Sequence, residues 1–366
     1  MRILDRYILK SVLNIFFTCL FTFLLLYVII DIFSRLEDIL KQKMAFEALL
    51  QYYLAYQPVI FIQVVPFAGL LATLYTFGKL NRDNEIIAMR ASGMSIFQVS
   101  KTVIIFGAIL SLLIFWMGDK LVPLSLAAQK KFIEQLDSWK KPQNKEQPQV
   151  ISNLSMYGIK NRLFFVNKFS LAEKSMEGIT ILEHDEHQNI TKKVVANSGV
   201  FKDGVWMFYH CITYNFDANG QISDEPQYFQ EEMMTIPETP QDFFTQRQHP
   251  DSMTIAQLED YLWKLSKSGA VGVIRNLKVD LYQKFTAPLM SLIMIMIAIP
   301  FSFMMRRRST GMSSLGISIL VGFLYYVLNA VSIALGKAGV APPIIAASLS
   351  HLLFFIFSVC LIFRLP

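Results

Sequence analysis

Apolar residues along this chain gather in six long blocks, three toward each end, and the middle of each block is nearly free of charge. A helix needs roughly 20 apolar residues to cross a bilayer, and a charge at its centre costs roughly 2.5–3.5 kcal/mol on an insertion scale. The pattern therefore predicts six transmembrane helices. Their expected bounds are 11–33, 49–78, 96–118, 285–305, 309–336 and 338–363.

The long middle segment, residues 119–284, has a different pattern. The run VWMFYHCITYNF, Val205 to Phe216, is rich in β-branched and aromatic residues, as strands are. Asp203-Gly204 just before it is typical of a two-residue hairpin turn, and further turns are expected at Asn197-Ser198-Gly199 and Asn219-Gly220. We therefore expect an inserted all-β domain, an antiparallel sandwich or jelly roll.

Helices are expected to connect this domain to the membrane. Two capping boxes mark helix starts: Ser95-Ile96-Phe97-Gln98 begins the third span, and Thr254-Ile255-Ala256-Gln257 begins a helix over 254–268. Residues 124–140 are expected to prolong the third span. The expected organisation is a first transmembrane half, a β domain with flanking helices, and a second transmembrane half, at 1–118, 119–284 and 285–366.

Lysine and arginine residues near the block ends predict the orientation. One group shares a side with the N-terminus: Arg2, Arg6, Lys10, Lys79, Arg82, Arg90, Lys101, Arg306, Arg307, Arg308 and Arg364. The short loops on the other side carry Arg35, Lys41, Lys43 and Lys337. Because the cation-rich side is cytoplasmic, both termini are expected inside and residues 119–284 outside. The formal net charge of +6 then needs no nucleic-acid partner.

The sequence offers little that indicates catalysis. It contains no G-x-x-x-x-G-K-[ST] phosphate loop and no H-E-x-x-H zinc motif. The cluster EHDEH, Glu183 to His187, is expected to be a solvated turn, because neither its spacing nor a fourth ligand specifies a metal site. Cys19, Cys211 and Cys360 are expected to be unpaired packing residues. We therefore expect a chain that is not an enzyme and binds no cofactor or metal.

The polar stretch KLNRDNEIIAMRASGMS, Lys79 to Ser95, separates the second and third blocks. It predicts an independent helix over 82–92. Asn81 or Asp83 can cap the start of this helix, and Gly93 can end it in a left-handed conformation.

That predicted helix mixes apolar with charged side chains. Ile86, Ile87 and Met89 stand among Glu85 and Arg90. A short helix of this kind fits a groove on a partner protein, with apolar anchors inserted and charges fixing the register. The alternative is an amphipathic connector that rests on lipid.

Polar and small residues within the last two spans each have two interpretations. An ionisable group such as His351 inside a membrane is a candidate functional residue. A neutral histidine hydrogen-bonded between helices is nevertheless the favoured reading, because two serines lie nearby. Ser314, Ser318 and Gly322 recur every four residues, so another helix can approach closely. That helix can belong to the same subunit or to a second one.

Several stretches together resemble one known family. They are the opening ILDRYILKSVL, the stretch LNRDNEIIAMRASGMS, and the C-terminal runs GISILVGFLYYVLNAV and GVAPPIIAASLSH. This combination is similar to the lipopolysaccharide export permeases, the YjgP/YjgQ (LptF/LptG) family. The LDRY opening and the PPI motif before the last span are closer to its LptG branch.

The resemblance implies a permease subunit of an ABC-type exporter in the bacterial inner membrane. Such a subunit forms a heterodimer with an LptF-like paralogue, and a dimer of a cytoplasmic LptB-like ATPase, which uses ATP and Mg, drives the pair. Lipopolysaccharide is taken from the outer leaflet and passed to an LptA-like periplasmic bridge, with a membrane-anchored LptC-like protein. The middle domain then corresponds to a periplasmic jellyroll that receives the lipid.

The resemblance also implies roles for particular residues. The helix over 82–92 corresponds to the coupling helix of the family, with Glu85 at the position of its acidic contact to the ATPase. The expected coupling residues are Asn84, Glu85, Ile86, Met89 and Arg90. The first and fifth spans correspond to a lateral gate between the paralogues, which includes Ser314, Ser318 and Gly322.

Lipid A phosphates call for cations near the outer interface. The candidates just outside the first span are Arg35, Lys41 and Lys43. Acidic residues interrupt them at Asp31, Glu37 and Asp38. The alternative function is a membrane scaffold, or an ABC-type permease or mechanotransmission subunit for another lipid or envelope process. Apart from His351 the spans lack ionisable groups near the membrane midplane, which an ion-coupled transporter needs, and no hydrolase constellation is found.

Overall fold

The computed structural model describes most of the chain. The described residues are 3–37, 39, 46–140, 150–158, 161–185, 189–202, 204–217, 221–234, 236–245, 250–266, 271–304 and 311–364. The chain divides into two compact units, Met1–Glu134 with Lys278–Pro366, and Gln135–Leu277. We call the first the helical unit and the second the β unit.

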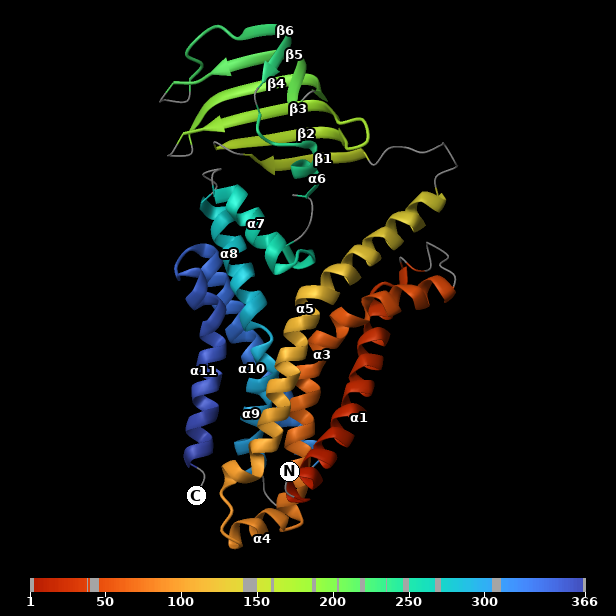
Figure 1. Ribbon diagram of the computed structural model, residues 1–366, viewed down its shortest axis with the longest axis vertical. Helices are drawn as coiled ribbons and strands as arrows, with labels where there is room; N and C mark the ends of the chain where they lie inside the picture. The colour runs from red at the N-terminus through yellow and green to blue at the C-terminus, as the bar shows by residue number, and fades with distance from the viewer. Residues whose placement is uncertain are drawn as a thin grey trace. The chain divides into compact units, whose positions relative to one another are not determined.

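The helical unit is built from long apolar helices (Figure 1). They are α1 (Ile3–Ser34), α3 (Phe46–Arg82), α5 (Ile96–Lys140), α8 (Val271–Thr286), α9 (Leu289–Met304), α10 (Gly311–Ala338) and α11 (Pro343–Arg364), with the short α4 (Glu85–Ala91) between α3 and α5. The last residues of α5, 135–140, and the first of α8, 271–277, belong to the β unit. Among the described residues, five helices are long and apolar enough to cross a membrane, or six if the bent pair α8 and α9 is one span. These helices agree with the six expected spans, and α5 continues through Lys140 as expected.

The fourth span differs from its expected bounds of 285–305. Helix α8 ends at Thr286, α9 begins at Leu289, and the two are bent by 53°. The break falls at Pro288, inside the expected span, where the missing N–H and the ring of proline both disfavour helix. The 16 residues of α9 rise about 24 Å, less than the ~30 Å of a bilayer core. A span at this place therefore needs part of α8.

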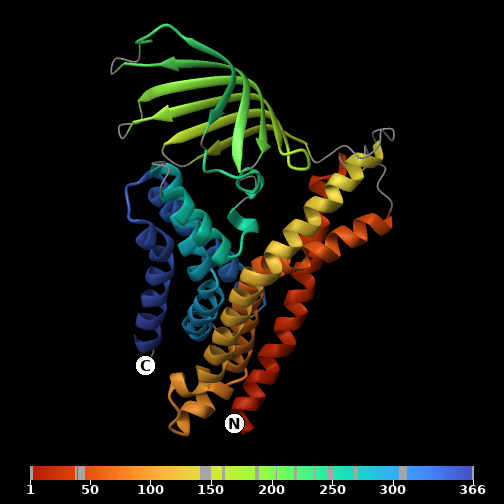
Figure 2. The same ribbon diagram turned by 45° about the horizontal axis from the view of Figure 1, so that its top comes forward.

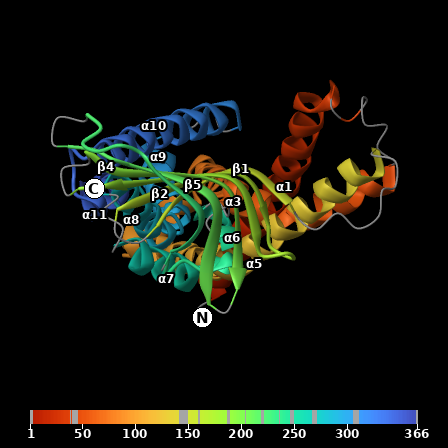
Figure 3. The ribbon, with the colours of Figure 1, turned by 90° about the horizontal axis from the view of Figure 1, so that it is seen from above.

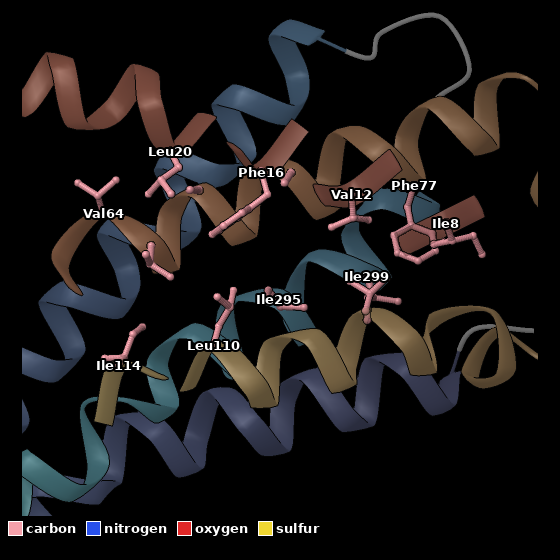
Figure 4. Close-up of a cluster of buried hydrophobic side chains, with 14 of the residues drawn as sticks. Ile8, Val12, Phe16, Leu20, Val64, Phe77, Leu110, Ile114, Ile295 and Ile299 are labelled. Atoms are coloured by element: carbon pink, nitrogen blue, oxygen red, sulfur yellow. The ribbon is translucent and has the colours of Figure 1, made fainter. Parts of the chain in front are cut away.

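Helix α3 is the packing centre of the helical unit. It contacts α1, α9 and α10, and it contains Pro58 and Pro66 without a break. One buried cluster joins α1, α3, α5 and α9 (Figure 4) and includes Ile8, Val12, Phe16, Phe77, Leu110, Ile295 and Ile299. A second cluster joins α3, α9, α10 and α11 and includes Leu74, Ile297, Tyr325 and Phe354.

The β unit contains a single antiparallel sheet within the described residues, and the sheet is strongly curved (Figure 2). Its strands are β1 (Val150–Tyr157), β2 (Arg162–Ser170), β3 (Ser175–His184), β4 (Ile190–Lys202), β5 (Val205–Asn215) and β6 (Gln227–Met234). They lie side by side in chain order, each antiparallel to the next. The expected antiparallel β domain is confirmed, but its described strands form one curved sheet in meander order and not the two packed sheets of the expected sandwich.

The pairing of all six strands is interrupted at one level of the sheet. The register skips Asn167, Gly178, Asn197 and His210, which stand opposite one another in β2 to β5 and which we call the bend row. The skip continues at Asn153 of β1 and Gln230 of β6. Gly178 has φ +62° and His210 has φ +52°. Both values lie in the left-handed region, which strands normally avoid. The bend row is therefore a local departure from regular sheet geometry.

The bend row explains the curvature of the sheet. In β2 the buried side chains pass from Val166 to Phe169, and in β5 from Phe208 to Cys211, a spacing of three where regular alternation gives two. Each strand thus has two successive outward residues at this level, as at a β-bulge. The outer face becomes longer than the inner face, and the sheet curves around one shared core that contains side chains from both sides of the row.

The turn expected at Asn197-Ser198-Gly199 is wrong, because these residues lie inside β4. The glycine there serves close packing: a Cβ on Gly199 would lie 2.7 Å from Cδ1 of Phe208. The hairpin at Asp203-Gly204 is confirmed, since Lys202 pairs with Val205 and Gly204 has φ +83°. The turn expected at Asn219-Gly220 lies outside the described residues.

Short helices follow the sheet within the β unit. They are α6 (Pro240–Thr245), the 3-10 turn Pro250–Ser252 and α7 (Ile255–Ser266). Phe243 of α6 packs edge-on against the ring of Trp206, whose Nε1 donates to the Glu238 carbonyl at 2.7 Å. The capping box of α7 is confirmed, because the Gln257 amide donates to Thr254 Oγ1 at 3.2 Å and the Thr254 amide donates to Gln257 Oε1 at 2.9 Å.

Candidate functional site: the short helix α4 and the cavity beside α1

Helix α4 lies at the end of the helical unit where α1 begins and α11 ends (Figure 1). It spans Glu85–Ala91, shorter than the expected 82–92, because α3 continues through Arg82. The expected side-chain caps are not formed: Asn84 is the N-cap residue, with φ +61° and no side-chain cap hydrogen bond. Gly93 ends the helix with φ +86°, as expected. A left-handed turn therefore sets α4 off from α3.

Two apolar residues hold α4 against the rest of the helical unit. Ile86 and Met89 are buried and belong to the same cluster as Ile96 and Phe77. These two side chains therefore anchor α4 within its own chain, and only Ile87, with an exposed fraction of 44%, is left as an exposed large apolar side chain of the helix. Burial of this kind stabilises a side chain by about 1.5–3 kcal/mol, which holds a seven-residue helix in place.

The remaining expected coupling residues are accessible. Asn84 and Arg90 are exposed and Glu85 is half-buried. The start of the next helix is fixed by the expected capping box, in which the Gln98 amide donates to Ser95 Oγ at 3.2 Å and the Ser95 amide donates to Gln98 Oε1 at 3.1 Å. The helical unit therefore presents α4 as a fixed, charged projection.

Glu85 also has a partner within the chain that the sequence did not reveal. The Tyr7 hydroxyl, near the start of α1, donates to Glu85 Oε1 at 3.2 Å. Two residues earlier, Asp5 is buried and accepts a hydrogen bond from Thr102 of α5 at 3.2 Å. Both residues belong to the LDRY opening, which carried the family resemblance without an assigned role.

A cavity of about 450 Å³ lies beside residues 23–34, the C-terminal part of α1. Its walls come from α1, α3 and α10, and α1 and α10 lie on either side of α3 (Figure 3). The lining is mainly aromatic and aliphatic, and includes Phe23, Leu26, Tyr27, Ile30, Phe67 and Tyr326. An apolar cavity with a few polar groups suits a ligand with hydrocarbon chains.

The polar side of this cavity is formed around Asp31. Tyr53 donates to Asp31 Oδ2 at 2.8 Å, and Arg35 Nε lies 3.2 Å from Asp31 Oδ1. Arg35, one of the three candidate phosphate ligands, is thus paired with a carboxylate. Lys41 and Lys43, the other two, lie outside the described residues.

Among the small residues of α10, Gly322 packs against α3. Ser318 is buried. A Cβ on Gly322 would lie 2.5 Å from Cε1 of Phe67, whose ring stacks on Tyr326 with centroids 5.5 Å apart. The side chain of Ser314 lies outside the described residues. Gly322 therefore admits an aromatic ring of the same chain.

His351 belongs to a buried polar cluster between α10 and α11. Ser350 donates to Asn329 Oδ1 at 2.8 Å, and its hydroxyl lies 3.3 Å from His351 Nδ1. Tyr325 packs edge-on against the imidazole, with centroids 5.6 Å apart. The cluster joins two neighbouring helices, and in this position it acts as interhelical polar contact.

The described residues hold no group of three or more His, Cys, Asp or Glu side chains that could bind a metal ion. His184 of the EHDEH cluster lies with its Nδ1 3.3 Å from the Asn161 carbonyl, and His187 lies outside the described residues. Cys19, Cys211 and Cys360 are all free, as expected.

Known membrane permeases resemble this chain in sequence over nearly its whole length. A family model described as lipopolysaccharide export system permease LptF/LptG matches residues 6–364. LptG of Haemophilus influenzae is 24% identical over 380 residues, covering 96% of this chain and 96% of the relative. LptG of Escherichia coli K12 is 24% identical over 380 residues, covering 99% of this chain and 98% of the relative.

The fold and the comparisons together define a multi-pass membrane protein that carries a separate β domain. The chain belongs to the LptF/LptG family of lipopolysaccharide export system permeases. The resemblance that the sequence motifs carry is thereby confirmed.

Proposed function

We propose that the chain is the LptG-like permease subunit of an ATP-driven lipopolysaccharide exporter in the bacterial inner membrane. It pairs with an LptF-like paralogue, and a separate dimeric ATPase on the cytoplasmic side supplies the energy. The complex extracts lipopolysaccharide from the outer leaflet and passes it through the β unit to an LptA-like periplasmic bridge, with an LptC-like membrane-anchored partner. The chain itself binds no nucleotide and catalyses no reaction.

The orientation within this proposal rests on the ends of the helical unit. The two termini and α4 lie at one end of it (Figure 1), and the cation-rich ends of the expected spans share that side. By the positive-inside rule this end is cytoplasmic, so residues 119–284 are periplasmic and α4 faces the ATPase.

The observation that carries the proposal is the form of α4. A helix that is anchored through Ile86 and Met89 moves with the bundle, while Glu85, Ile87 and Arg90 offer a compact contact surface for another protein. The cavity between α1, α3 and α10 supplies apolar walls for acyl chains. Both parts belong to the helical unit, so motion at one end can change the other.

Charge reversal of Glu85 tests this proposal. The Glu85→Lys variant, co-expressed with the ATPase and the paralogous subunit of its own organism, is purified, and ATPase recovery and ATP-dependent lipopolysaccharide release from vesicles are measured. Loss of a close charge pair across an interface costs about 1.5 kcal/mol or more, so we expect about tenfold or more weaker ATPase association. Release should fall in parallel.

The matched control is Glu47→Lys, which makes the same charge change on an exposed residue in the first turn of α3. It should leave ATPase recovery and lipid release unchanged. Normal recovery and normal release with Glu85→Lys would overturn the coupling role. A complex that assembles and hydrolyses ATP but moves no lipid in its wild-type form would instead favour the scaffold.

A further inference from the structure

The LDRY opening of α1 places a buried acid against α5. Asp5 is 7% exposed, its Oδ1 accepts from Thr102 Oγ1 at 3.2 Å, and its Oδ2 lies 3.9 Å from Lys101 Nζ. A buried carboxylate is costly unless hydrogen bonds and an opposite charge compensate for the water it loses. The position of Asp5 is therefore defined by α5, and the first turn of α1 is fixed to that helix.

A second contact ties the same turn of α1 to α4. Tyr7 is two residues from Asp5, and its hydroxyl donates to Glu85 Oε1 at 3.2 Å. The bond joins residues 78 positions apart in the chain. Hydrogen bonds to an ionised acceptor are stronger than neutral ones, and this acceptor is the residue proposed to meet the ATPase.

The rest of α1 connects this point with the cavity. Ile8, Val12, Phe16 and Leu20 form a buried stripe, and they are followed by Phe23, Leu26, Tyr27 and Ile30, which line the cavity. From Tyr7 to Tyr27 an α-helix rises about 30 Å. A helix of this length behaves as a rod between its two ends, so displacement of its first turn reaches the cavity wall.

We propose that Tyr7 is a latch that makes α1 move with α4, and that Asp5 fixes the helical turn that carries Tyr7, so that ATPase motion received at α4 changes the cavity beside α1. Tyr7 and Asp5 are positioning residues in this scheme, and Thr102 holds Asp5. The inference rests on the proposed coupling of α4 to an ATPase. It adds the route by which that motion leaves α4 for the lipid site.

Deletion of the Tyr7 hydroxyl is the direct test. Tyr7→Phe keeps the ring and removes the donor to Glu85. We expect normal recovery of the ATPase and normal thermal stability, but about fivefold less lipopolysaccharide released per ATP hydrolysed, the ratio that corresponds to a hydrogen bond of about 1 kcal/mol. A ratio equal to that of the wild type would overturn the latch.

The chain offers a matched control and a second variant pair. Tyr75→Phe removes a hydroxyl from a half-exposed ring of α3 for which the described part of the chain shows no hydrogen bond, and it should not change the ratio. Thr102→Val removes the donor to Asp5 at nearly constant shape, and Thr102→Ser restores it. The ratio should fall in the valine variant and recover in the serine variant; equal ratios in the two would contradict the role of Asp5.

A distance measurement separates the latch from the function it rests on. Spin labels replace Ala88 on α4 and Phe17 on α1, both exposed and neither among the proposed contact residues, in a cysteine-free background. The distance between the labels should be the same with and without trapped ATP, and Tyr7→Phe should broaden its distribution. A shift on ATP trapping in the otherwise unchanged protein would overturn the latch. Failure of the wild-type chain to recover any ATPase would instead overturn the proposed function.

Discussion

Substitution of Gly178 by alanine should destabilise the β unit at its bend row. Gly178 has φ +62°, where an L residue costs about 1–2 kcal/mol. A Cβ at this position would also lie 2.3 Å from Asn167 Nδ2, so the Asn167 side chain has to rotate, at about 0.5–1.5 kcal/mol. Alanine loses less backbone entropy on folding than glycine, which returns about 0.5–1 kcal/mol. The net cost is about 1–2.5 kcal/mol.

Amide hydrogen exchange on the full chain measures this cost where it arises. The most protected amides of β2, β3 and β4 should exchange about five to seventy times faster in Gly178→Ala, because about 1–2.5 kcal/mol changes an opening equilibrium by that factor. Peptides from α3 should exchange as in the wild type. The comparison within one molecule removes differences in detergent and temperature.

A double variant separates the two contributions. Asn167 is exposed, so Asn167→Ala alone should have little effect on exchange. Combined with Gly178→Ala it removes the overlaps with Nδ2 and Cγ of Asn167 but leaves the Cβ of residue 167 at 2.9 Å and the left-handed backbone, so exchange should return only part of the way to the wild type. Unchanged protection in Gly178→Ala, or complete recovery in the double variant, would refute the backbone argument.

Two further predictions concern other parts of the chain. A Cβ on Gly336 would lie 2.3 Å from Cβ of Ala346, so Gly336→Ala should lower the free energy of unfolding by about 1–3 kcal/mol through overpacking of α10 against α11. Gly316 lies in open space on the same helix, and Gly316→Ala should raise it by up to ~1 kcal/mol. Thermal unfolding in detergent compares the two variants, and equal effects would contradict the packing. Burial, with a smaller contribution from Glu232, raises the pKa of the Cys211 thiol to about 11. When Cys19 and Cys360 are replaced by alanine, a maleimide at pH 8 should therefore label the chain only after denaturation. Labelling of the native chain would contradict this.

The transmembrane helices could be read from the sequence because each forms its own backbone hydrogen bonds and must be apolar along its length. The bounds of the helices depend on local capping residues. The sequence correctly predicted the end of α4 at Gly93 and the start of α5 after Ser95. The break at Pro288 was harder, since proline occurs both within α3 without interruption and at the bend between α8 and α9. Which result follows depends on how neighbouring helices pack, and a single sequence does not contain that information.

The bend row had a sequence signal that ordinary alternation obscures. Apolar residues in β2 and β5 step by three at one position, as from Val166 to Phe169 and from Phe208 to Cys211. In one strand such a step indicates only a local irregularity, and Asn197-Ser198-Gly199 was expected to be a turn because of its turn-forming residue types. Only when the strands are placed in register do the steps coincide, and then they indicate a curved sheet.

The contacts of the candidate site could not be predicted for a related reason. Tyr7 and Glu85 are 78 positions apart, and no periodicity within either segment predicts that they meet. A seven-residue helix is likewise too short for its pattern to decide between a face toward the bundle and a face toward a partner. Ile86 and Met89 were therefore grouped with the contact residues, although packing turns them toward the core.

Charge at the cavity limits what α1 alone can recognise. Arg35 and Asp31 lie 3.2 Å apart, so this pair brings no net charge to the cavity, and a phosphate at the Arg35 guanidinium would bring a second anion to a cation that already has one. Tyr53 holds the carboxylate in place from α3. Under the proposed function, recognition of a lipid phosphate therefore requires cations other than Arg35, while the described wall of the cavity contributes mainly apolar surface.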